Sequence, residues 1–104
     1  MNCKPTCFVK AVTANGTAER ITTKETKALY VSIQGTVGNT GDIYVGDSQV
    51  SATNAGAILD AGVQMELHAP VVGNGVVPIS LKDIWVDAGT AADKVNVFVL
   101  ERAD

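Results

Sequence analysis

The chain has 104 residues, of which 46% are hydrophobic and 18% charged, and this is the composition of one globular domain with a single core rather than of a disordered chain. Its formal net charge of −3, with eight scattered Lys and Arg residues, argues against a nucleic-acid binder, which needs clustered cations to displace counterions from phosphates. No apolar stretch has the length of a membrane span, and the N-terminus lacks the apolar core of a signal peptide. We therefore expect a protein that folds in a cytoplasm and binds neither nucleic acid nor membrane.

Short runs of alternating apolar residues, separated by turn formers, predict strands throughout the chain. Asn15-Gly16 predicts a hairpin between the first two strands, because a type I′ turn needs positive φ at both central positions. In residues 28–34, Leu29, Val31 and Ile33 share one face, which we expect to point into the core. The principal strands expected, in chain order, are residues 7–13, 17–23, 28–34, 42–45, 63–68, 83–86 and 94–100, with two short arms around a Gly-rich turn in 71–77.

The last of these strands is apolar on both faces. Val95, Val97 and Val99 share one side, while Phe98 and Leu100 share the other. Such a strand is central in its sheet, or its outer face meets another subunit.

The regular spacing of turn signals, with no sustained helical period, predicts the fold class. We expect an all-β domain, a small β-sandwich or jelly-roll-like barrel of about eight short strands. It should span residues 1–104 as a single domain, with residues 1–6 as an N-terminal docking arm.

Two cysteines, Cys3 and Cys7, are too few for a disulfide framework and would stay free in a reducing compartment. A metal site needs about four ligands, and only His68 adds a further soft ligand. We therefore expect no metal and no cofactor, and we interpret Cys7 as a small core residue at the start of the first strand.

His68 is the only histidine, and we expect it on the solvated face of its strand. A hydrolytic triad would need a nucleophile such as Ser48 or Ser51 beside it, but no nucleophile-elbow pattern surrounds either serine. Three acidic residues flank loops and could gather around a hard cation, namely Asp42, Asp47 and Asp60. Aspartate is also a common turn former, so we favour the interpretation that these are solvated turn residues.

The aromatic residues Tyr30, Tyr44 and Trp85 are expected on strand faces opposite the core. Exposed aromatics of this kind form stacking platforms in carbohydrate-binding sandwiches, and they are also enriched where subunits meet. We weight the subunit interface higher, because the apolar outer face of the last strand points the same way.

Residues 42–45 (Asp-Ile-Tyr-Val) return as residues 83–86 (Asp-Ile-Trp-Val), which suggests corresponding positions in two halves of an all-β unit. The ordered series TGDIYVGDSQVSATN in 40–54, LDAG in 59–62 and DIWVD in 83–87 resembles a recurrent type of small structural protein encoded in tailed-bacteriophage genomes. The resemblance covers roughly residues 28–100, and the leading segment with its two cysteines departs from the pattern.

Proteins of this type are virion components that decorate the capsid or belong to tails and fibres, and they are not known as enzymes. The resemblance therefore implies a non-enzymatic capsid decoration (cement) protein that binds and stabilises the phage head. Its partners would be the major capsid protein and further copies of itself, as a homo-oligomer such as a trimer. It would be made in the host bacterial cytoplasm and would lie on the capsid exterior of the virion.

The alternative is a tail or fibre protein that binds a host-surface carbohydrate, with Tyr44 or Trp85 as stacking residues. A hydrolase that uses His68 is the least favoured of three functions. Segments 1–10, 35–41 and 73–77 are candidate contact regions. The candidate contact residues for the capsid or for a second subunit are Phe8, Lys10, Tyr44, Asn74, Trp85, Phe98 and Leu100.

Overall fold

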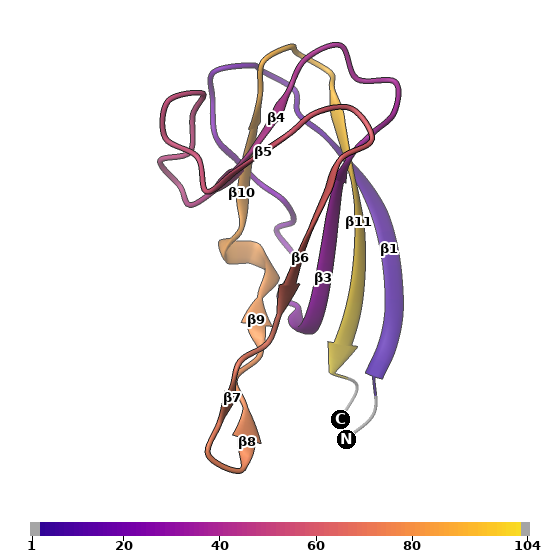
Figure 1. Ribbon diagram of the computed structural model, residues 1–104, viewed down its shortest axis with the longest axis vertical. Helices are drawn as coiled ribbons and strands as arrows, with labels where there is room; N and C mark the ends of the chain where they lie inside the picture. Colours follow the sequence, from indigo (N-terminus) through magenta and orange to yellow (C-terminus); the bar gives the residue numbers. More distant parts are fainter. Residues whose placement is uncertain (1–2, 103–104) are drawn as a thin grey trace.

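The computed structural model, which describes residues 3–102, consists of two antiparallel sheets and a separate two-stranded ribbon (Figure 1). Sheet A has the order β1-β11-β3-β6, with β9 also paired to β3, and sheet B has the order β2-β10-β4-β5. The strands are β1 (Cys3–Ala11), β2 (Glu19–Arg20), β3 (Lys27–Gly35), β4 (Ile43–Gly46), β5 (Ala57–Leu59), β6 (Gln64–His68), β7 (Val71–Val72), β8 (Gly75–Val76), β9 (Ile79–Ser80), β10 (Trp85–Ala88) and β11 (Lys94–Arg102). The prediction of an all-β fold is confirmed.

One apolar core lies between the two sheets, so the architecture is a small β-sandwich. Alternate residues of β3 and β11 point inward from sheet A, and alternate residues of β4 and β10 point inward from sheet B. Nearly all of these side chains are branched aliphatics, and burying each one contributes about 1.5 kcal/mol or more. The inward-facing residues of these four strands include Val31, Ile33, Val95, Val97, Val99, Ile43, Val45, Val86 and Ala88.

The last strand, β11, lies in the middle of sheet A, which was one of the two interpretations of its apolar faces. It pairs with β1 from Cys3↔Arg102 to Ala11↔Lys94 and with β3 from Val95↔Gly35 onward. Segments from the two ends of the described chain and from its first third therefore form one continuous three-stranded surface.

A bulge in β3 changes which of its residues face the core. The register with β11 shifts between Leu100 and Glu101, so that Leu100 pairs with Tyr30 and Glu101 with Ala28. Leu29 is the extra residue and is only half-buried, whereas Ala28 is fully buried. The prediction for Val31 and Ile33 is confirmed, and the one for Leu29 is wrong because the bulge reverses the alternation there.

The hairpin predicted at Asn15-Gly16 does not form. β1 pairs with β11 in sheet A, while β2 pairs with β10 in sheet B. The turn is nevertheless sharp, since Gly16 has a φ of +85° and its N–H donates to Asp87 Oδ1 at 2.9 Å. This turn carries the chain from one sheet to the other, and only residues 19–20 of the expected strand 17–23 are paired.

The first strand begins at Cys3 rather than at residue 7, so residues 3–6 are not a free docking arm. They pair with the end of β11, from Cys3↔Arg102 to Thr6↔Val99. The first two residues of the expected arm 1–6 lie outside the described residues. The prediction of a buried Cys7 is also wrong, because Cys7 is exposed on the outer face of β1.

The two similar stretches 42–45 and 83–86 do not occupy equivalent places in two halves. Strands β4 and β10 are direct antiparallel neighbours in sheet B, with Val86↔Val45 and Asp87↔Tyr44 in register. The two stretches also differ locally, because a 3₁₀ turn, η1 (Leu81–Asp83), precedes β10, and the strand in the second stretch begins only at Trp85.

Candidate interaction surfaces

The outer face of sheet A is a regular surface formed by side chains of four neighbouring strands. The register of four strands places its side chains in three rows. Its apolar members gather over β1 and β11, where Val9 is 59% and Phe98 42% exposed. The rows, taken across β1, β11, β3 and β6, are Pro5, Leu100, Tyr30 and His68; then Cys7, Phe98, Ser32 and Glu66; then Val9, Asn96, Gln34 and Gln64.

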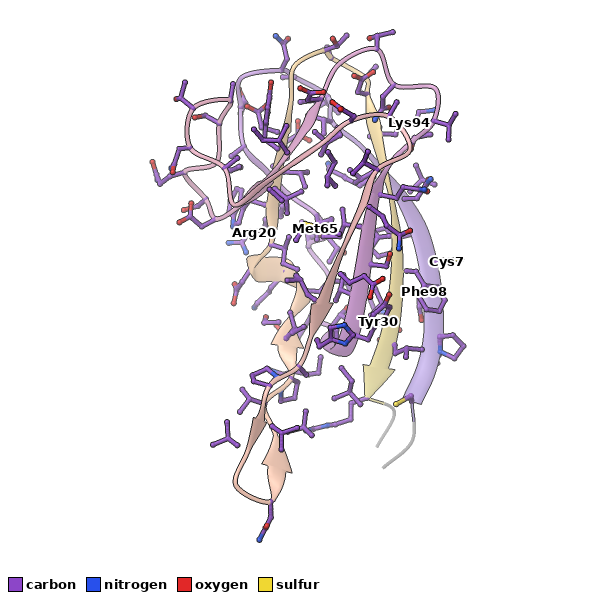
Figure 2. All side chains as sticks on the ribbon, viewed as in Figure 1. Cys7, Arg20, Tyr30, Met65, Lys94 and Phe98 are labelled. Atoms are coloured by element: carbon purple, nitrogen blue, oxygen red, sulfur yellow. The ribbon has the colours of Figure 1, made fainter. Side chains whose placement is uncertain are left out.

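Tyr30 is at the centre of an aromatic group on this face. Its ring centroid is 6.3 Å from that of Phe98, in an edge-to-face arrangement, and 5.2 Å from that of His68. His68 Nε2 lies 3.6 Å from a Glu66 carboxylate oxygen, and its side chain is mostly exposed, as the sequence predicted. Figure 2 shows Cys7, Phe98 and Tyr30 on the neighbouring strands β1, β11 and β3.

A hollow of about 490 Å³ lies on the same face, and we call it the sheet A hollow. Apolar groups of Cys7, Val9 and Phe98 form part of its wall, and amide and hydroxyl groups form the rest. Asn96 Nδ2 donates to Gln34 Oε1 at 3.2 Å, which fixes two of these amides relative to each other. All of its lining residues are uncharged: Cys7, Phe8, Val9, Ser32, Gln34, Gln64, Asn96, Val97 and Phe98.

Strands β7 and β8 form a small ribbon that we call the valine hairpin (residues 71–77). Figure 1 shows it extending from the end of the sandwich beyond β9. Gly73 has a φ of +60°, and Gly at the first central position, with positive φ there alone, is the mark of a type II′ turn. Val71 is 73% exposed, Val72 63% and Val77 50%, so the hairpin presents valines to solvent on both of its faces.

The outer side of sheet B carries the other two predicted aromatics. Arg20 stacks on Trp85, with its guanidinium carbon 4.7 Å from the ring centroid, so one face of the indole is occupied. Tyr44 is half-buried and lines a polar hollow of about 430 Å³. The other residues around this hollow are Asn15, Gly16, Ser51, Ala52, Thr53, Asp87, Ala88 and Gly89.

Two of the three aspartates considered for a cation come together. The hydrogen bond to Asp60 raises the pKa of the Asp42 carboxyl, and burial and the charge of Asp60 act in the same direction. Asp47 instead accepts a hydrogen bond from the N–H of Gln49 within its own turn, at 2.9 Å. Within residues 3–102, no three His, Cys, Asp or Glu side chains are grouped in a way that could hold a metal ion.

The loop 35–41, expected as a contact region, is anchored to the start of β11. Asp93 Oδ2 accepts the N–H of Gly41 at 2.8 Å, and the Asn39 side chain exchanges two hydrogen bonds with the backbone of Lys94, at 2.7 and 2.8 Å. This loop therefore has a fixed shape, and it lies at the opposite end of the molecule from the valine hairpin (Figure 1).

The predicted contact residues fall into separate places. Phe98 and Leu100 share the outer face of sheet A, and Asn74 lies at the exposed tip of the valine hairpin. Tyr44 and Trp85 belong to sheet B. The remaining two, Phe8 and Lys10, lie on the inward side of β1: Phe8 packs against the core, and Lys10 Nζ pairs with Glu19 Oε1 at 2.8 Å.

Sequence reasoning interpreted Cys7 as a core residue and did not single out Val9 within the candidate contact segment 1–10. Their place became clear only from the register between β1 and β11, which puts Cys7 beside Phe98. The valines of the hairpin carried a usable signal, because residues 69–79 contain no charged side chain and only one amide.

No helix among residues 3–102 has the length and apolar character needed to cross a membrane. Comparison of the chain with protein-family models, with curated proteins and with solved structures gives no match.

Proposed function

We propose that this protein is a non-enzymatic virion component that decorates the head of a tailed phage and stabilises its shell. The observation that carries the proposal is the pair of apolar surfaces on a rigid sandwich, namely the outer face of sheet A and the valine hairpin. Apolar area of this kind marks places where proteins associate. The resemblance of residues 28–100 to small phage structural proteins supplies the partner, the major capsid protein.

The mechanism is binding across junctions between coat subunits. Each copy adds contact area without chemistry, and the stabilisation multiplies because many copies bind one shell. The outer face of sheet A suits this role, since β1, β11 and β3 form a continuous surface whose backbone hydrogen bonds hold its shape.

The test is binding of the purified protein to expanded phage heads, followed by co-sedimentation and by the melting temperature of the shell. We expect saturable binding and a higher shell melting temperature. Unchanged melting together with no co-sedimentation would refute the proposal. Heads that already carry their own decoration protein provide the control, because their sites are occupied.

The second candidate is a tail or fibre protein that binds a host-surface carbohydrate. The hollow beside Tyr44 favours it, since one aromatic ring there is surrounded by hydroxyl and amide groups. Binding to a glycan array that is lost in a Tyr44→Ala variant, without any affinity for heads, would favour this function over decoration.

A further inference from the structure

The valine hairpin is poorly suited to stand alone in water. A two-stranded ribbon without a third layer is marginally stable, and here Val71 and Val72 point to opposite faces and are both mostly exposed. Within the described part of the chain, its strands β7 and β8 pair with each other and with no other strand. Covering its valines would both stabilise the ribbon and remove apolar surface from solvent.

The sheet A hollow has the size and chemistry to receive the hairpin. Its volume of about 490 Å³ lies within the range of roughly 300–1,000 Å³ found for sites that accept ligand-sized groups. The apolar groups of Val9, Cys7 and Phe98 would meet valine side chains. The amides of Gln34 and Asn96 would meet Asn74 and the peptide groups of the turn.

The absence of charge on both surfaces is the second match. Charged residues make up 18% of the chain, yet residues 69–79 carry none, and the residues that line the hollow carry none. Closing the hairpin over the hollow would therefore bury no charge from the residues of either one, which avoids a large desolvation cost. The Glu66 carboxylate, which accepts a hydrogen bond from Gln64 of the hollow at 3.4 Å, is the charged group beside this contact. A strongly charged partner would find no complementary group on either surface.

We propose that the valine hairpin of one copy inserts into the sheet A hollow of a second copy. A neighbour must supply the hairpin, because the molecule's own hairpin extends away from its sandwich (Figure 1). Each copy offers one hairpin and one hollow, so the contact is head-to-tail and closes into a ring if the rotation allows. This inference rests on the proposed function, for which it supplies the mode of self-association.

The test uses thiols at the two ends of the proposed contact. Cys7 lines the hollow and Asn74 lies at the hairpin tip. One protein carries Cys3→Ser alone, which leaves its thiol in the hollow. The other carries Cys3→Ser, Cys7→Ser and Asn74→Cys, which leaves its thiol on the hairpin. We expect mild oxidation of the mixture to give disulfide-linked heterodimers at least about tenfold above the control.

The matched control places the second thiol at Val37, in place of Asn74. Val37 is 76% exposed and belongs to the loop at the opposite end of the molecule. A heterodimer yield no higher than that of the control would overturn the inference, and so would a predominance of either homodimer. The mixture is also oxidised in the presence of phage heads. A disulfide from position 74 to coat protein, instead of to Cys7, would overturn the inference and would identify the capsid as the partner of the hairpin.

The same proteins separate this inference from the proposed function. Cross-linking without any binding of the wild-type protein to heads would support insertion of the hairpin into the hollow and refute the proposed capsid decoration. Binding to heads without cross-linking would support capsid decoration and refute insertion of the hairpin into the hollow.

Discussion

Replacing the two most exposed strand valines of the hairpin, Val71→Ser and Val72→Ser, should weaken self-association. These side chains are 73% and 63% exposed in the single chain, and burying a whole valine contributes about 1.5 kcal/mol. Covering the exposed part of each of these two side chains should therefore contribute about 1 kcal/mol to association. The double variant should lose about 2 kcal/mol of association free energy, a rise of roughly 30-fold in Kd.

Sedimentation equilibrium over a series of protein concentrations measures this Kd directly. Stability of the isolated chain should change by less than about 0.5 kcal/mol, because surface substitutions away from special features have small effects. The control is Val37→Ser, which removes a valine of similar exposure, 76%, far from the hairpin. An unchanged Kd in the double variant, or an equal rise in the control, would contradict the reasoning.

Three further predictions concern stability. Ala92 has a φ of +71°, so Ala92→Gly should stabilise the protein by about 0.5 kcal/mol in chemical denaturation; a loss of stability would argue against strain there. The hydrogen bond to Asp60 raises the pKa of Asp42. Protonated Asp42 therefore stabilises the folded state below pH 3.8, and this stabilisation is lost as pH rises through the raised pKa. Asp60→Asn should therefore raise the Tm at pH 7 but not at pH 3, and equal shifts at both pH values would refute this. Burial raises the pKa of Glu19, but its hydrogen bond from Lys10 and further bonds from backbone and hydroxyl groups outweigh burial and lower it. The stabilisation is present above pH 4.5 and is lost as pH falls through the lowered pKa, so Glu19→Gln should cost about 1 kcal/mol at pH 7. That difference should shrink at pH 3 in urea denaturation, and a constant difference would contradict it.

Local pattern was enough to predict the fold class and part of the core. Alternation identified Val31, Ile33 and the three valines of β11, because one face of a strand meets the core and the other does not. The apolar outer residues Phe98 and Leu100 left two interpretations of β11 open, and the structure shows the first of them, a central strand with a neighbour on each side.

Pairing partners were beyond the reach of local pattern. Asn15-Gly16 specifies a sharp turn but does not specify which strand lies beside the next one, and here β2 joins the other sheet. The bulge at Leu29 is likewise set by register with β11, some seventy residues away. The exposure of Cys7 follows from the same long-range register, so the hollow could not be predicted before the sheet was known.

The place of β11 between β1 and β3 also bears on how the protein is made. Strands β1 and β3 leave the ribosome before β11, but neither can find its main hydrogen-bonding partner until residues 94–102 have been synthesised. In sheet B, β2 waits in the same way for β10, whereas β4 can pair with β5 as soon as residue 59 has been made. Pairing between distant parts of a chain is slow because the intervening loop must close first. Newly made chains should therefore hold β1 unpaired until β11 has been made, which is the interval in which a chaperone or an unwanted neighbour could capture it.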